Sequence, residues 1–245
     1  ITGTNGKTTT AIILQHLLGL PDRPCGLIGG VFNDDGHERT PAALTTPQGT
    51  ELSRVLASMV DNGCRFAVME VSSHALAQGR VDSLKFDLGI FTNLSGDHLD
   101  FHGSMQAYAR AKRRLFEMLP ADGLAIVNID DERGLAMAAA ASCPVIECGS
   151  GATAHVLCMR EDLSGSLARF EGPWGGFEAA LPLVGRHNLQ NALQAISAAV
   201  HLGVPVDRII ERLQCCPCPP GRLQMVPGSC EDSPVFIDFA QTDEA

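Results

Sequence analysis

The sequence lacks the features that bring a protein to a membrane or to nucleic acid. No apolar run approaches the roughly 20 residues that span a bilayer. Lysine and arginine together number 18 against 28 acidic residues, and the resulting net charge of −10 repels nucleic acid and anionic lipid. No stripe of basic residues reverses that balance. We therefore expect no nucleic-acid partner and no membrane partner.

Signs of secretion are missing as well. The first residues have the pattern of a strand end and a glycine-rich loop, not that of a signal peptide. Nine cysteines, an odd number, are scattered through 245 residues, and a chain of this length with 45% hydrophobic residues buries a core without cross-links. Reduced thiols fit the cytoplasm better than a disulfide framework does. A cytoplasmic, monomeric, globular protein is the expectation.

Apolar runs alternate with helical patterns through the first 150 residues. We expect strands over residues 25–32, 65–72, 86–92, 124–129 and 144–148, and helices over 10–18, 48–61, 104–119 and near 132–141. Such alternation indicates βαβ units. The predicted fold class is α/β, with a doubly wound, mostly parallel sheet.

The pattern changes after residue 150. Residues 151–182 contain three short strand patterns with no helix between them, which predicts a small antiparallel β region. Helices are expected over residues 188–202 and 206–213, and a last strand over 235–239.

A glycine-rich loop stands between a strand end and an amphipathic helix. Its sequence is Gly3-Thr4-Asn5-Gly6-Lys7-Thr8-Thr9. Free backbone N–H groups and the helix dipole favour an anion there, the lysine can reach the β- and γ-phosphates of a nucleotide, and the first following threonine can bind Mg²⁺. The standard P-loop has a further glycine where this chain has Ile1, so the loop is a shortened variant. An ordinary glycine turn before a helix is the alternative, which the flanking pattern disfavours.

Polar residues follow two of the expected strands, where open α/β sheets bind their ligands. Glu70 ends the first of these strands and is costly to bury unless it pairs or binds a cation, so we interpret it as a Mg²⁺ ligand. The alternative is a solvated carboxylate at a strand terminus. His98 follows the second strand within a loop of Asp and His residues, where it is either a metal ligand or a capping residue.

Taken in order, these and later motifs resemble the Mur ligase family. Besides the loop, the motifs are Thr45-Thr46-Pro47, Glu70-Val71-Ser72-Ser73-His74, Asn93-Leu94 with Asp97-His98-Leu99-Asp100, Ala111-Lys112 with Leu115-Phe116, Gly185, Asn188, Asn191 and Gly221-Arg222. Within that family they are most similar to the UDP-N-acetylmuramoyl-tripeptide synthetases. Such an ordered series covers nearly the whole chain and is highly specific.

The resemblance implies an ATP-dependent amide ligase of peptidoglycan precursor synthesis. Such an enzyme joins diaminopimelate or lysine to UDP-N-acetylmuramoyl-L-alanyl-D-glutamate through an acyl phosphate, with ATP and Mg²⁺. Residues 1–238 would be the central ATP-binding domain, and residues 239–245 would begin the linker to a C-terminal domain. We expect that domain and the N-terminal UDP-binding domain to be absent here, and the piece alone to be inactive.

Site residues are carried over position by position from the resemblance. ATP would be held by Gly3, Thr4, Asn5, Gly6, Lys7, Thr8, Thr9, Asn188, Arg222 and Asp238. The muramoyl dipeptide would be held by Thr45, Thr46, Ser72, Gln78 and Arg80. Catalytic roles fall on Lys7, His98 and Lys112, and metal ligation on Thr8, Glu70, His98 and a carbamylated Lys112. Without the resemblance, the arginines beside Lys112 favour a solvated basic helix face.

The final motif departs from the family. Phe239 and Gln241 stand where the family usually has tyrosine and histidine, and a glutamine cannot transfer a proton by titration. This departure keeps a non-catalytic ATP-binding module as one alternative. The others are another Mur or folylpolyglutamate-type ligase, and a P-loop kinase or NTPase switch.

Overall fold

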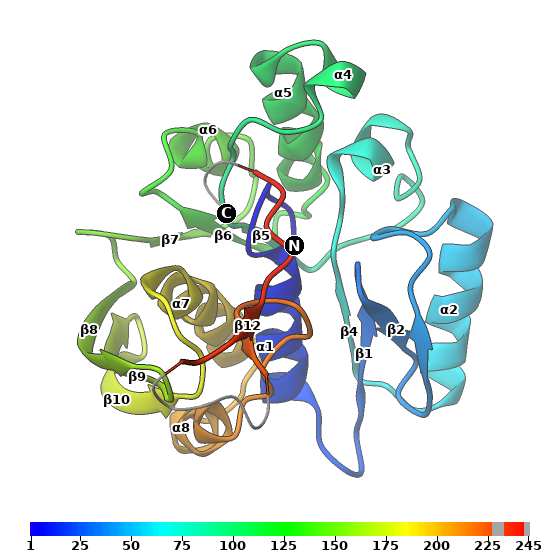
Figure 1. Ribbon diagram of the computed structural model, residues 1–245. Helices are drawn as coiled ribbons and strands as arrows, with labels where there is room; N and C mark the ends of the chain where they lie inside the picture. Colours follow the sequence, from blue (N-terminus) through cyan, green and yellow to red (C-terminus); the bar gives the residue numbers. More distant parts are fainter. Residues whose placement is uncertain (227–232, 243–245) are drawn as a thin grey trace.

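Two sheets organise the computed structural model, which describes residues 1–226 and 233–242 (Figure 1). One sheet has the order β3-β2-β1-β4, and its strands are β1 (Cys25–Ile28), β2 (Phe32–Asp34), β3 (Arg39–Pro41) and β4 (Phe66–Met69). The other has the order β5-β6-β7, with β5 (Leu88–Phe91), β6 (Leu124–Asn128) and β7 (Val145–Cys148). Pairings β1–β4, β5–β6 and β6–β7 are parallel, whereas β2 and β3 pair antiparallel at one edge.

The first two residues of the chain join these sheets. The Ile1 amino group donates to the Met69 carbonyl at 2.8 Å, and the Val71 amide donates to the Ile1 carbonyl at 2.7 Å. On the other side, Thr2 bridges Phe91 in the parallel sense. The result is one mostly parallel sheet in which residues 1–2 lie between β4 and β5, as predicted for the fold class.

Helices cover both faces of the sheet because strand side chains alternate. In β6, Leu124 and Ile126 belong to one apolar cluster and Ala125 and Val127 to another. The first cluster includes α1 (Lys7–Leu18), α7 (Arg186–His201) and α8 (Val206–Gln214). The second includes α2 (Gly49–Asp61), α5 (Met105–Glu117) and α6 (Gly134–Ala138). This two-sided cover is the predicted doubly wound arrangement (Figure 1).

The antiparallel region lies where the sequence predicts it. Strands β8 (His155–Asp162), β9 (Gly165–Gly172) and β10 (Gly175–Leu181) form a separate sheet of order β10-β9-β8. It packs on α7 and α8 at one side of the molecule (Figure 1). Among the described residues, no helix combines the length and the apolar character needed to cross a bilayer.

Three expected strands are wrong in extent, and one of them, predicted over residues 65–72, is only β4 (Phe66–Met69). The strand predicted over residues 25–32 ends at Ile28, and the chain turns through Gly29 and Gly30 into the antiparallel β2. The turn lets the Gly30 amide donate to Glu70 Oε1 at 2.8 Å. The strand predicted over residues 235–239 reduces to β12 (Phe236–Ile237), paired with β11 (Gln224–Met225).

Candidate active site

The phosphate loop lies between the parallel strands and α1, at the carboxyl edge of the sheet. Gly6 takes a φ of 83° immediately before α1, a conformation that favours glycine. A Cβ at Gly6 would collide with Asn191 Oδ1 on α7, and a Cβ at Gly3 would collide with Thr92 Oγ1. The glycines therefore allow the loop to lie directly against α7 and the end of β5.

Residues after β5 and near the chain end hold this loop in place. The Asn5 amide donates to Asn93 Oδ1 at 2.8 Å, and Asn93 Nδ2 donates to the Asn5 carbonyl at 3.1 Å. Thr92 Oγ1 also donates to the Asn5 carbonyl, at 2.6 Å. The Asn5 side chain donates to Thr242 Oγ1 at 2.9 Å. The loop conformation is thus fixed by side chains that lie far away in the sequence.

Glu70 lies next to the phosphate loop and is only 2% exposed. Its Oε2 accepts from the Thr8 hydroxyl at 3.0 Å, and its Oε1 accepts from the Gly30 amide at 2.8 Å. A buried carboxylate needs such partners. The alternative of a solvated strand-end carboxylate is therefore wrong.

Lys7 lies over the loop from which it projects. Its Nζ donates to the Gly3 carbonyl at 2.9 Å and to the Thr4 carbonyl at 2.7 Å. Burial lowers the pKa of Lys7 below its usual value, and the negative charge of Glu70 opposes that shift. The cation and the carboxylate are therefore close enough to interact electrostatically.

The loop after β5 brings Asp97 and His98 to the same place. His98 has a φ of 52° and precedes α4 (Leu99–His102), but its side chain makes no capping hydrogen bond. Instead, His98 Nε2 lies 3.3 Å from Asp97 Oδ2, and the His98 amide donates to Asp97 Oδ1 at 2.8 Å. Asp97 is a site residue that the sequence interpretation missed, although its position beside His98 was a usable signal.

These groups line one cavity of roughly 210 Å³. Its walls are Thr4, Asn5, Gly6, Lys7, Thr8, Thr9, Gly30, Thr45, Glu70, Asp97, His98, Arg222, Phe239, Gln241 and Thr242. Two carboxylates, a histidine and two cations from segments far apart in the sequence thus meet at one place. Such a set fits a polyanion bound together with a divalent cation.

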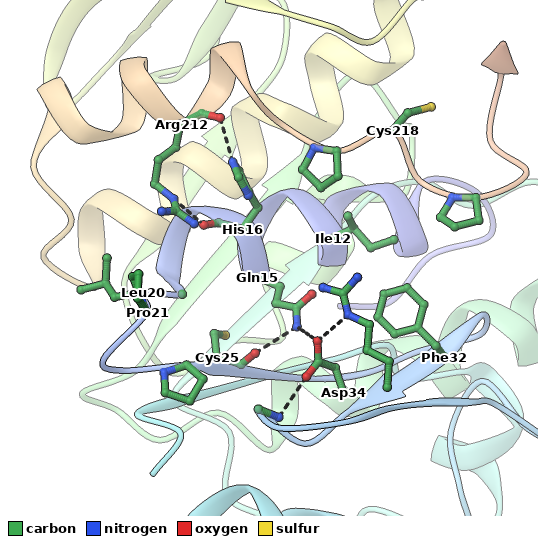
Figure 2. A pocket seen from close by; sticks show the side chains of 16 residues that line it. Ile12, Gln15, His16, Leu20, Pro21, Cys25, Phe32, Asp34, Arg212 and Cys218 are labelled. Carbon is green, nitrogen blue, oxygen red and sulfur yellow. Dashed lines mark hydrogen bonds and ion pairs between the residues drawn. The ribbon is translucent and has the colours of Figure 1, made fainter. Parts of the chain in front are cut away.

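A larger cavity of roughly 440 Å³ lies along the C-terminal half of α1 (Figure 2). Its polar side chains are paired with one another. Asp34 Oδ2 accepts from Gln15 at 3.0 Å and from Arg39 at 2.8 Å, and Arg212 exchanges hydrogen bonds with His16. None of the predicted site residues lines this larger cavity.

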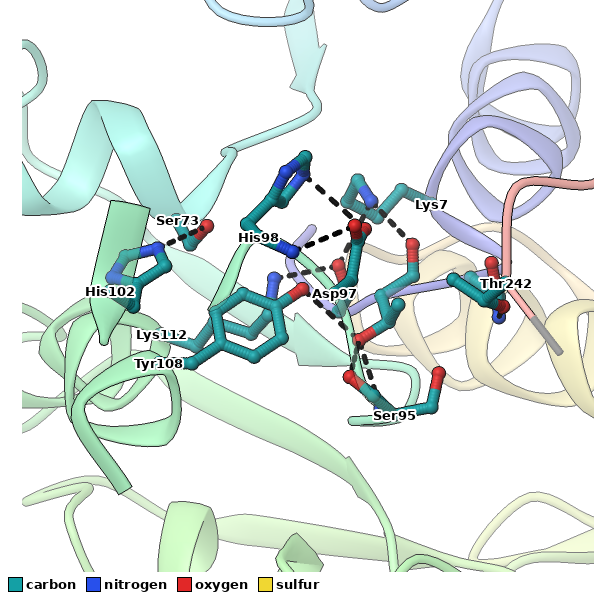
Figure 3. A network of polar contacts seen from close by, with 12 residues as sticks. Lys7, Ser73, Ser95, Asp97, His98, His102, Tyr108, Lys112 and Thr242 are labelled. Atoms are coloured by element: carbon teal, nitrogen blue, oxygen red, sulfur yellow. Dashed lines mark hydrogen bonds and ion pairs between the residues drawn. The ribbon is translucent and has the colours of Figure 1, made fainter. Parts of the chain in front are cut away.

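Lys112 lies inside the molecule on α5 and is 1% exposed (Figure 3). Its Nζ donates to the Gly3 carbonyl at 2.7 Å and lies 4.5 Å from the centre of the Tyr108 ring. Burial lowers the pKa of Lys112 well below its usual value, Lys7 lowers it further, and Asp97 opposes both. The solvated helix face favoured by the residues alone is therefore wrong, because Lys112 lies on the buried face of an otherwise basic helix.

The residues predicted to hold the muramoyl dipeptide also lie together. The Thr46 hydroxyl donates to the Glu70 carbonyl at 2.9 Å and accepts from the Ser72 amide at 3.0 Å. Arg80 donates to the Thr46 carbonyl at 2.8 Å and to Gln78 Oε1 at 2.8 and 2.6 Å. With Thr45 in the cavity wall, this polar cluster adjoins Glu70.

The predicted nucleotide-side residues are more dispersed. Arg222 lines the phosphate cavity, and its Nη1 donates to the Phe239 carbonyl at 2.8 Å. Asn188 lines an adjoining cavity of roughly 260 Å³ that also touches Arg222. Asp238 Oδ1 accepts from the Leu223 amide at 3.0 Å and lines neither cavity.

The oxygen atoms near the phosphate loop suit Mg²⁺ better than they suit a metal ion whose ligands all come from the protein. Thr8 and Glu70 offer oxygen atoms within one hydrogen bond of each other. In residues 1–226 and 233–242, no group of three or more His, Cys, Asp and Glu side chains could hold a metal ion. Mg²⁺ usually takes one or two carboxylates and completes its shell with phosphates and water. The residues present therefore fit an ion that arrives with a nucleotide.

Comparison with known proteins shows the family of the chain. The family described as the Mur ligase middle domain matches residues 1–199. A protein of Synechococcus elongatus named UDP-N-acetylmuramoyl-L-alanyl-D-glutamate--2,6-diaminopimelate ligase is 40% identical over 248 residues, covering 100% of this chain and 50% of that protein. The chain belongs to the Mur ligase family.

Solved structures show the same relationship. One ligase with the same name as the Synechococcus protein superposes with a TM-score of 0.82 at 29% identity, over 93% of this chain and 48% of that one. MurF of Thermotoga maritima, solved in complex with ADP, shares the fold with a TM-score of 0.72 at 20% identity, over 94% of this chain and 50% of that one. The chain spans about half the length of the curated relatives it matches.

Proposed function

We propose that this chain is the ATP-binding part of a ligase that adds diaminopimelate to UDP-N-acetylmuramoyl-L-alanyl-D-glutamate. Relatives with that named activity align with the whole chain at 38–40% identity. Residues 1–238 would form the central domain, and the chain from residue 239 would begin the linker, of which residues 243–245 lie outside the described part. Domains for the uridine nucleotide and for the incoming amino acid would lie in the remaining half.

One observation carries the proposal. The Thr8 hydroxyl of the phosphate loop donates to Glu70 at 3.0 Å, inside the cavity that Lys7, Asp97 and His98 also line. A carboxylate and a triphosphate repel each other. A side chain that binds a cation next to the phosphate loop is therefore needed to bring these two anions together.

Each residue of the cavity would have a defined task. The loop amides and Lys7 would bind the β- and γ-phosphates of ATP, and Thr8, Glu70 and His98 would supply protein ligands to Mg²⁺. When bound, Mg²⁺ would neutralise phosphate charge. Arg222, which lines the same cavity, would bind the nucleotide from the far side.

The reaction would proceed in two displacements. A γ-carboxylate oxygen of the D-glutamyl residue attacks the γ-phosphorus of ATP, a P–O bond forms, and the bond to ADP breaks. The incoming amine nitrogen then attacks the acyl carbon, phosphate leaves with the C–O bond electrons, and the amine loses a proton as the amide forms. The chain would contribute mainly orientation and charge neutralisation.

The polar cluster beside Glu70 would orient the acyl substrate. Arg80 is held by Thr46 and Gln78, so its guanidinium is preorganised to bind a carboxylate or another anionic group. Ser72 and Thr45 add hydroxyl groups next to it. This position, adjacent to the proposed Mg²⁺ ligand, suits a carboxylate that must reach the γ-phosphate.

Lys112 would react with carbon dioxide. Because burial lowers the pKa of Lys112, a larger share of the amine is neutral and nucleophilic. The neutral amine nitrogen would add to the carbon of carbon dioxide and lose one proton, which gives a carbamate and turns an uncharged group into a negatively charged one. We also propose a cytoplasmic location, supported by the free cysteines of the described residues.

ATP turnover by the full-length protein tests the proposal. ADP release is measured with the muramoyl dipeptide alone, with diaminopimelate alone, with both and with neither. Turnover only with both supports the ligase, and Lys7→Ala should abolish it whereas the exposed Lys85→Ala should not. Turnover without the amine would favour a kinase or NTPase, and ATP binding without any turnover would favour a non-catalytic module.

A further inference from the structure

The only tyrosine of the chain, Tyr108, lies beside the proposed site and is fully buried. It stands on α5, four residues before Lys112, so the two side chains share one face of the helix. None of the motifs described above includes it. A buried tyrosine needs a partner for its hydroxyl, and the identity of that partner indicates what Tyr108 does.

The Tyr108 hydroxyl lies 3.1 Å from Thr4 Oγ1 in the phosphate loop. Thr4 Oγ1 donates its single proton to the Ser95 carbonyl at 3.3 Å and accepts from the Ser95 amide at 3.0 Å. With that proton directed to Ser95, we assign Tyr108 as the donor to Thr4. Burial raises the pKa of Tyr108 to about 12, so its donor proton is retained at neutral pH.

The ring of Tyr108 contacts the other side of the site (Figure 3). Lys112 Nζ lies 4.5 Å from the ring centre, so the ring packs directly against the end of the lysine side chain. The His98 ring meets it edge-on at 6.2 Å, and the His102 ring lies 5.1 Å away. One side chain thus joins the phosphate loop, the buried lysine and the histidine loop.

We propose that Tyr108 is a positioning residue with two separable contacts. Its hydroxyl fixes Thr4 and hence the phosphate loop, and its ring fixes the Lys112 amine against that loop. This inference rests on the proposed ATP site.

Two substitutions separate the contacts. Tyr108→Phe keeps the ring over Lys112 and removes the hydroxyl group that donates a hydrogen bond to Thr4. Tyr108→Leu removes both. Phe116→Leu is the matched control, because Phe116 is a fully buried aromatic residue of the same helix that packs in the apolar cluster away from the cavity.

The dissociation constant for ATP, measured by calorimetry on the full-length protein, tests the hydroxyl. We expect Tyr108→Phe to weaken ATP binding about 3- to 10-fold, as for the loss of one hydrogen bond. In a Thr4→Val background the same substitution should have no further effect. Equal weakening in both backgrounds would overturn the coupling to Thr4.

Steady-state kinetics test the ring. Tyr108→Phe should raise KM for ATP and leave kcat within about 2-fold, whereas Tyr108→Leu should lower kcat at least about 10-fold. Phe116→Leu should lower the melting temperature and leave both constants unchanged. Equal kcat values for the Phe and Leu variants would overturn the contact with Lys112. A wild-type protein that binds no ATP would instead overturn the proposed function.

Discussion

At the scale of single residues, burial decides what Glu70 can do. The carboxylate lies inside the protein with a hydroxyl and an amide as its hydrogen-bond donors, and neither donor is a cation. The two hydrogen-bond donors therefore balance the negative charge of Glu70 only in part, and Lys7 supplies the nearby positive charge. A group in that state binds a divalent cation favourably, because the cost of burying its charge has already been met in folding.

Replacing this carboxylate by an amide removes the charge and keeps the shape. Glu70→Gln should lower the substrate-dependent ATP turnover of the full-length protein about 100-fold or more, since a charge facing the phosphates is lost. The half-maximal Mg²⁺ concentration for ATP binding should rise. Glu178→Gln, an exposed glutamate of the antiparallel region, should change neither quantity. Unaltered Mg²⁺ dependence in Glu70→Gln would remove Glu70 from the metal site.

Gly6 gives a second prediction, on stability. Gly6→Ala should cost about 1–2 kcal/mol for the left-handed backbone and about 1–3 kcal/mol more for the forced contact with Asn191. Gly63→Ala is the matched control, because Gly63 has a φ of 76° and nothing within 4 Å of the added Cβ. Denaturant titration compares the two. Equal losses of unfolding free energy would mean that the loop does not press on α7.

Some residues of the site could be read from the sequence and others could not. Lys7, Thr8 and Glu70 are local to a recognisable loop or strand end. Lys112 was predicted only through the family resemblance, because its neighbours in the sequence are arginines and only the tertiary packing places it inside. Tyr108 had no sequence signal, since a single buried tyrosine on an amphipathic helix is usually core.

At the scale of elements, α5 is a helix whose buried face includes an ionisable side chain. Its buried face consists of Tyr108, Ala111, Lys112, Leu115 and Phe116. Four of these residues are apolar or aromatic, and the fifth is an amine that costs free energy to bury. Such a residue lowers the stability of the fold unless its charge is lost or paired.

The free energy that burial of the Lys112 amine costs can be measured by removing that amine. In carbonate-free buffer, Lys112→Met should raise the unfolding free energy by about 1–3 kcal/mol at pH 7 and abolish turnover in the full-length protein. Because folding lowers the pKa of Lys112 from its usual 10.5, the wild type regains stability as pH rises towards 10.5. The advantage of the variant should therefore shrink between pH 7 and pH 10. An advantage that is constant with pH would mean that the pKa of Lys112 is not lowered.

The long helices were predicted closely, and two short helices were not predicted. Helices α2, α5 and α7 agree with the predicted ranges to within about two residues, because each repeats apolar residues over several turns. Helices α3 (Ser73–Ala77) and α4 (Leu99–His102) were missed, since four or five residues cannot establish a period. Both follow strands at the carboxyl edge, and they carry or adjoin the residues of the candidate site.

At the scale of the molecule, the site depends on contacts between distant segments. Residues 1–2 lie between β4 and β5, so the phosphate loop, Glu70 and His98 emerge side by side at one edge of the sheet. The alternation of strands and helices predicted a parallel sheet, but no local pattern gives the order of its strands. In this acidic chain, Lys7 and Arg222 line one cavity, and Lys112 is buried against the Gly3 carbonyl of the phosphate loop.

Cysteine reactivity tests the packing of the whole chain. Burial raises the pKa of Cys25, Cys148 and Cys216 to about 12, so these thiols are protonated and shielded at pH 8. Alkylation mapped by mass spectrometry should label the exposed Cys158 and Cys215 first, and the three buried thiols only in denaturant. Labelling of Cys148 at the rate of Cys158 would contradict the described core.

The account depends on a carboxylate meeting the γ-phosphate of ATP in the cavity around Lys7 and Glu70. The most direct test uses UDP-N-acetylmuramoyl-L-alanyl-D-glutamate labelled with ¹⁸O in its γ-carboxylate, turned over with ATP and diaminopimelate by the full-length protein. An acyl phosphate transfers one labelled oxygen to the phosphate that leaves, and the amide keeps the other. We predict one ¹⁸O atom in each released phosphate. Amide formation with unlabelled phosphate would contradict the account.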